Sequence, residues 1–196
     1  MVTQTIQNSP TPIASGWLKR YYFTRFAFSA AWVVIAFSVA PSVPVLAAIM
    51  LVGYPARDAI ANFFDAQRSG SLGQNKSQLF NIIVSIITTI AVVVALGSSL
   101  NSVLVVFGIW AGFSGILQLA TAVGRWKSVG AQWVMILSGA QSVIAGVAMI
   151  AMAYGPAPVG IVSVAPYAAF GAFYFALSAI WLTISDARQG NLRTAN

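Results

Sequence analysis

The stretch "LFNIIVSIITTIAVVVAL", Leu79 to Leu96, holds eighteen residues and no charged side chain. A helix needs about 20 mostly apolar residues to cross the hydrocarbon core of a bilayer. The stretch is continuously apolar and does not alternate between apolar and polar residues, which favours a helix over a strand of a transmembrane barrel. It therefore predicts a membrane-spanning helix.

Similar runs occupy most of the remaining chain. They cover Tyr22–Ala40, Val45–Asp65, Val103–Val123, Trp133–Ala153 and Val159–Ile184. Of the 196 residues, 59% are hydrophobic and 7% are charged, and the mean hydropathy is +0.84, far from the averages of soluble domains. We predict an all-α, polytopic membrane protein with six transmembrane helices in residues 17–188. Residues 1–16 are expected to form a mobile cytoplasmic tail and residues 189–196 a second cytoplasmic tail.

Charged side chains gather at one end of the predicted helices. The loops "PSVP", "GSSLNS" and "YGPAP", at 41–44, 97–102 and 154–158, carry no charge. By the positive-inside rule both termini face the cytoplasm. The net charge of +7 then indicates anionic lipid as the partner of the basic residues, rather than nucleic acid. The basic residues are Lys19, Arg20, Arg25, Arg57, Arg68, Lys76, Arg125, Lys127, Arg188 and Arg193.

Two sets of residues recur at the same intervals. From Tyr54 to Trp110 is 56 residues and from Trp110 to Tyr167 is 57. The same intervals separate three serines, Ser29, Ser85 and Ser142. Recurrence at a fixed period indicates a repeated unit. We interpret residues 17–68, 77–127 and 132–188 as three helical hairpins in the same orientation.

The repeats resemble the HdeD-like family of short-repeat bacterial membrane proteins. The likeness covers roughly Leu18 to Arg188 and is carried by Trp133, by "LSG" at 137–139 with Gly146, by proline in the turn at 154–158, and by Trp110 to Gly115. It implies six helices in the bacterial inner membrane, an association with acid resistance, and no catalytic residues. The first hairpin departs from the pattern, with Arg57 and Asp58 where the other copies have Phe113-Ser114 and Phe170-Gly171.

A candidate polar site lies at the cytoplasmic end of the first hairpin. It comprises Arg25, Arg57, Asp58, Asn62 and Asp65. Arg25 and Asp58 are almost equidistant from the turn "PSVP", so we expect them to pair. One interpretation is interfacial anchoring, in which arginines reach lipid phosphates. The other is a functional site for a proton or an ion, because a carboxylate within the membrane is costly to bury.

Small residues recur along two other predicted helices. Gly108, Gly112 and Gly115 share a face of one helix, and Gly139 and Gly146 share a face of the next. Such spacing lets helix backbones approach closely. We expect these glycines to pack helices within the chain, while packing between copies in a homo-oligomer stays open.

The side chains offer little for catalysis. The chain has no histidine and no cysteine, so it lacks an imidazole base, a thiol nucleophile and a transition-metal cluster. We therefore expect no enzyme activity, no metal and no cofactor. The resemblance to the HdeD-like family then implies a stress-related or envelope-associated membrane protein. The alternative is a small transporter or channel with a charged cytoplasmic mouth at Arg25 and Asp58.

Overall fold

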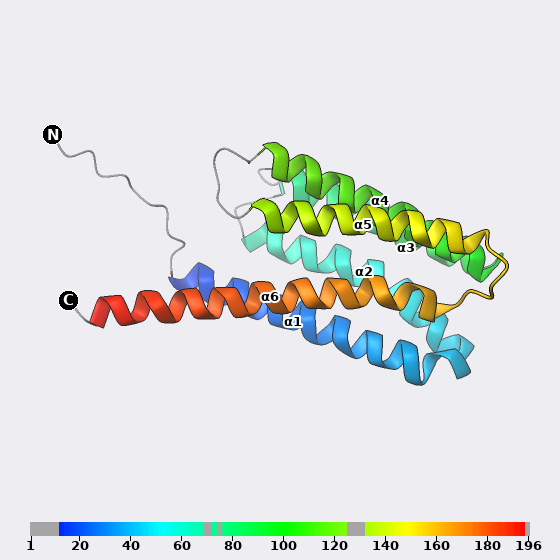
Figure 1. Ribbon diagram of the computed structural model, residues 1–196, viewed down its shortest axis with the longest axis horizontal. Coiled ribbons are helices and arrows are strands. Elements are labelled where there is room, and N and C mark those ends of the chain that lie inside the picture. Colours follow the sequence, from blue (N-terminus) through cyan, green and yellow to red (C-terminus); the bar gives the residue numbers. More distant parts are fainter. Residues whose placement is uncertain (1–11, 69–71, 74–75, 125–131, 195–196) are drawn as a thin grey trace. The chain divides into compact units, whose positions relative to one another are not determined.

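The computed structural model describes residues 12–68, 72–73, 76–124 and 132–194. Within these ranges the chain forms long α-helices and a short 3-10 turn, and no strand (Figure 1). The all-α prediction is therefore confirmed for this part of the chain. The elements are α1 (Pro12–Ser38), η1 (Ala40–Ser42), α2 (Pro44–Arg68), α3 (Lys76–Leu96), α4 (Leu100–Gly124), α5 (Gln132–Ala153) and α6 (Ile161–Thr194).

Local sequence explains where several helices begin. Pro12 and Pro44 are the first residues of α1 and α2, a position where the missing N–H of proline costs nothing. Ser99 precedes α4, and its Oγ accepts a hydrogen bond of 3.1 Å from the Ser102 N–H, which caps that helix. At the start of α6, Ser163 Oγ accepts a bond of 3.3 Å from the Gly160 N–H.

Five of the helices are long and apolar enough to cross a membrane, namely α2 to α6. They indicate a multi-pass membrane protein. The helix α1 has 27 residues but is not among the five, because its first half is polar and carries Lys19, Arg20 and Arg25. The predicted count of six spans therefore stays a prediction.

Two helices extend beyond the predicted spans. Residues 12–16, expected in a mobile tail, belong to α1, while residues 1–11 lie outside the described residues. The helix α6 continues ten residues beyond Ile184, through most of the predicted tail at 189–196. Hydropathy marks the thickness of the bilayer and not the ends of a helix, which can continue beyond the apolar run.

The chain divides into two compact units. Unit 1 comprises Met1–Ala31 and Ala168–Asn196, and unit 2 comprises Trp32–Tyr167. In unit 1 the beginning of α1 packs antiparallel to the end of α6. Lys19 Nζ lies 2.8 Å from Asp186 Oδ2, and the rings of Tyr22 and Phe175 stack at 6.4 Å.

In unit 2, α2, α3, α4 and α5 run side by side (Figure 1). The α4–α5 contact is the closest because glycine backbones meet there. A Cβ on Gly146 would lie 2.5 Å from the Gly108 carbonyl oxygen, and one on Gly115 would lie 2.5 Å from that of Gly139. At the other end of this contact, Asn101 Nδ2 donates a bond of 2.7 Å to the Ala153 carbonyl at the end of α5.

The outward faces of the helices are apolar. Val94 and Ile144 are 71% and 68% exposed, and between 17% and 39% of the apolar window of each candidate span is buried. Such a surface suits contact with lipid tails rather than with water.

Candidate functional site

Aromatic side chains gather in the interior of unit 2. Trp110 of α4 lies between Tyr54 of α2 and Tyr167 of α6, and both ring centroids are 6.0 Å from that of Trp110 in edge-on geometry. Two more rings complete what we name the aromatic cluster: Trp32, 5.0 Å from Tyr54, and Phe107, 5.9 Å from Trp110. Except for the half-buried Tyr167, all these side chains are buried. Edge-on pairs add about 0.5–1.5 kcal/mol each to the burial of their area.

Trp32 also makes a polar contact with α2. Its Nε1 donates a bond of 3.0 Å to the Met50 carbonyl. Pro55 lies inside α2 and lacks the N–H that would bond the Leu51 carbonyl, the residue next to the acceptor of Trp32. The buried indole N–H thus finds its acceptor on the backbone of α2.

The repeat-related residues differ in where the structure places them. The aromatic trio Tyr54, Trp110 and Tyr167 is brought together, which fits three copies of one hairpin contributing equivalent residues to one interior. The serine trio has no comparable arrangement. Ser85 is buried on α3, Ser142 is half-buried on α5, and Ser29 is buried in the other unit.

Polar side chains join α2 to α3. Asp58 Oδ2 accepts bonds of 2.9 Å from Asn62 Nδ2 and 3.0 Å from Ser85 Oγ. Two turns along the helices, Asp65 Oδ2 accepts a bond of 3.3 Å from Gln78 Nε2. We name these five residues the polar seam. From Asp58 to Asp65 and from Gln78 to Ser85 is seven residues each, so antiparallel helices align both contacts.

The sequence did not lead us to Gln78 as a partner of Asp65, nor to Asp58 as the partner of Ser85. A signal was present, because Gln78, Asn81, Ser85 and Thr88 follow one another at helical spacing on α3. Opposite them on α2, Asp65, Asn62 and Asp58 have the same spacing in reverse order. Matching two polar faces of this kind predicts the register of an antiparallel helix pair.

The two predicted arginines of the polar site lie in different units. Arg57 is half-buried on α2 in unit 2, beside the polar seam in sequence. Arg25 belongs to unit 1, where its Nη1 donates a bond of 2.7 Å to the Tyr21 hydroxyl. Its guanidinium carbon also lies 4.3 Å from the centre of the Phe175 ring, a cation–π contact. The pairing of Arg25 with Asp58 stays a prediction.

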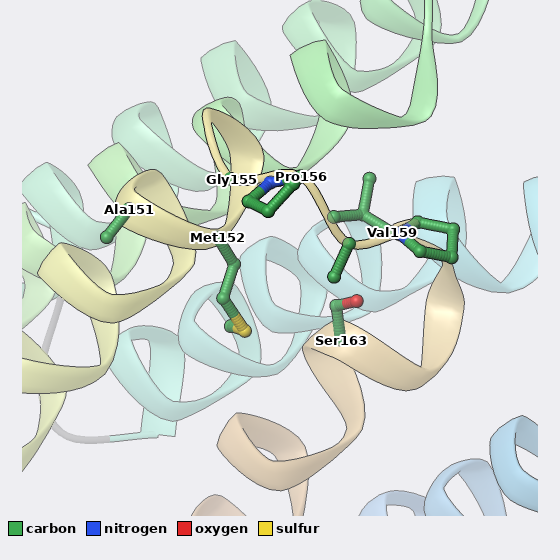
Figure 2. A pocket seen from close by; sticks show the side chains of 8 residues that line it. Ala151, Met152, Gly155, Pro156, Val159 and Ser163 are labelled. Carbon is green, nitrogen blue, oxygen red and sulfur yellow. The ribbon is translucent and has the colours of Figure 1, made fainter.

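An apolar pocket of about 390 Å³ lies at the turn between α5 and α6 (Figure 2). Figure 2 shows the side chain of Met152 from α5 and that of Ser163 from the start of α6 on the same side of this turn. The pocket is lined by no charged side chain, and its one hydroxyl, on Ser163, already caps α6. It therefore offers shape but no group for acid–base or nucleophilic chemistry. Among the described residues, no group of three metal-ligating side chains occurs either.

The fold and the long apolar helices define the class as a multi-pass helical membrane protein. Residues 81–151 match the model of a family described as "Short repeat of unknown function (DUF308)". The match covers most of α3, all of α4 and most of α5, including Ser85, Trp110 and the glycine contact. Comparison with curated proteins and with solved structures finds no match. The match supports a likeness to this family over residues 81–151, while the three-hairpin repeat and the narrower likeness to the HdeD-like family stay predictions.

Proposed function

We propose that this chain is a non-enzymatic stress protein of the bacterial inner membrane, associated with the envelope and with acid resistance. The observation that carries the proposal is the aromatic cluster. Rings from α1, α2, α4 and α6 meet inside unit 2, where a transporter would need a path for its substrate. A bundle packed in this way acts through its surface and its partners.

The carboxylates of the polar seam support the non-enzymatic role. Asp58 and Asp65 are seven residues apart on α2, which is about 10.5 Å along a helix. Each accepts a hydrogen bond from α3, so the geometry suits joining two helices. Two carboxylates at this distance do not share a proton.

Survival at acid pH tests the stress role. Host cells that lack the chain should survive a shift to acid medium less well than cells that carry it, with no difference at neutral pH. Trp110→Ala, which opens the aromatic cluster, should reduce survival. Phe113→Ala, on the lipid-facing side of the same helix, is the matched control and should not. Equal survival with and without the chain would contradict the proposal.

The polar seam favours a second candidate, a small transporter or channel. A half-buried Asp58 inside a candidate span is the kind of residue that ion-coupled proteins use. Proton flux into liposomes under an imposed pH gradient separates the two candidates. Flux that exceeds empty liposomes and disappears in folded Asp58→Asn would support transport. Flux equal to that of empty liposomes would support the stress protein.

A further inference from the structure

The exposed apolar residues of several helices form straight stripes, and each stripe ends in a basic residue. On α6 the stripe ends in Arg188, which is exposed. Its members recur every three or four residues, the spacing that keeps side chains on one helix face. They are Phe170, Phe173, Leu177, Trp181 and Ile184.

The stripe on α6 fixes the depth of Arg188. Trp181 is 70% exposed among apolar neighbours, so it lies at the height of the lipid tails. Arg188 follows two turns later, about 10.5 Å along the axis. Its position is therefore at the layer of the lipid headgroups, on the same side of the helix as the tails.

The same arrangement occurs at the beginning of α1. Arg20 is exposed, and Phe23 follows it on the exposed face at 46% exposure. The neighbouring Lys19 differs, because it points at α6 and is held by Asp186 at 2.8 Å. Lys19 and Arg20 are adjacent, so their side chains point about 100° apart around the helix axis. Lys19 therefore pairs with Asp186, whereas Arg20 points outward.

Unit 2 repeats the pattern on α3. Lys76 is exposed and begins a stripe of apolar side chains that runs the length of the helix. Its members are Phe80, Ile83, Ile87, Ile90 and Val94. A basic side chain at the end of an apolar, lipid-facing stripe is positioned to bind a molecule that combines acyl chains with a negative headgroup.

We propose that Arg20, Lys76 and Arg188 each bind the phosphate of an anionic phospholipid whose acyl chains lie along the adjoining stripe. The charge of the side chain selects the headgroup, and the stripe selects the tails. A basic residue near the membrane surface contributes about 1 kcal/mol of attraction to anionic lipid, which is roughly a fivefold preference. The inference depends on the membrane placement of the chain and not on the proposed stress role.

Native mass spectrometry of the purified full chain tests the proposal. The protein, in neutral detergent, is mixed with phosphatidylglycerol and phosphatidylcholine of identical acyl chains, and the retained lipids are counted. The chain should retain phosphatidylglycerol in preference. Arg20→Gln and Arg188→Gln should each abolish the roughly fivefold preference at one of the three sites, and so lower the preference of the whole chain. Lys19→Gln removes the same charge from an inward position and should leave it unchanged.

Further experiments test whether each variant folds and whether the bound phosphate belongs to a lipid. Arg20→Lys keeps the charge and should keep the preference, and a thermal unfolding curve of each variant shows whether it is folded. If Arg20→Gln does not fold, Lys76→Gln tests the same pattern in unit 2. Inorganic phosphate in excess should not displace the lipid. Equal losses in Lys19→Gln and Arg20→Gln, displacement by inorganic phosphate, or no preference for phosphatidylglycerol would each overturn the proposal.

Discussion

Asp58 and Ser85 illustrate how single residues hold two helices together in a medium without water. Lipid tails are as apolar as the side chains between helices, so burial of apolar area does not choose partners there. A hydrogen bond of 3.0 Å from Ser85 Oγ to Asp58 Oδ2 does favour one partner, because lipid tails offer no donor or acceptor in its place. The pair therefore contributes to the choice of α3 as the neighbour of α2.

A double-mutant cycle of Asp58→Ala and Ser85→Ala measures this contribution. We expect a coupling free energy of about 0.6 kcal/mol, and at most about 2 kcal/mol, as for other hydrogen bonds between membrane helices. The measurement is unfolding of the purified protein in mixed micelles. Ser38→Ala is the control, because Ser38 Oγ donates only to the Val34 carbonyl of its own helix. A coupling as large for Ser38 as for Ser85 would contradict the prediction.

At the scale of helices, the glycines of α4 and α5 differ in what a methyl group would meet. A Cβ on Gly146 would lie 2.5 Å from the Gly108 carbonyl oxygen and 2.8 Å from the Gly112 nitrogen. A Cβ on Gly112 would meet no atom within 4 Å. Gly146 is thus required for its missing side chain, whereas Gly112 contributes backbone atoms that alanine would also supply.

Gly146→Ala should therefore lower the free energy of unfolding by roughly 1–3 kcal/mol, the usual cost of overpacking. Gly112→Ala should be neutral or stabilising, because alanine favours a helix by up to about 1 kcal/mol over glycine. Thermal unfolding of both variants in detergent measures the difference. Equal destabilisation would show that the helices do not approach each other as closely as the structure has them.

Helices could be predicted from the sequence better than contacts could. The runs such as Leu79–Leu96 marked every long helix, because bilayer thickness fixes the length of apolar sequence. The ends at Pro12 and Thr194 were missed because nothing apolar marks them. The repeat pointed to Tyr54, Trp110 and Tyr167 but not to their contact, and the bond from Ser85 to Asp58 needed the register of two helices. Matching the polar faces of α2 and α3 would have indicated that register, whereas hydropathy alone does not.

For the whole molecule, the number of spans decides on which side each loop lies. With six spans in the predicted orientation, Gly16 near the start of α1 lies in the cytoplasm, while Ser42 and Ser98 lie outside. If α1 does not span, Gly16 and Ser42 share one side. The side chains of Arg25 and Tyr21 explain how a polar α1 could still cross, since the guanidinium is held by the Tyr21 hydroxyl and the Phe175 ring within unit 1.

Single cysteines test this topology cleanly, because the chain contains none of its own. A membrane-impermeant thiol reagent added to intact spheroplasts should label Ser42→Cys and Ser98→Cys but not Gly16→Cys or Lys76→Cys. After permeabilisation all four should react, which shows that the unlabelled sites were protected by the membrane. Labelling of Gly16→Cys together with Ser42→Cys in intact spheroplasts would reduce the count to five spans. It would also place Arg20 outside and so remove it from the cytoplasmic leaflet, where the positive-inside rule puts it.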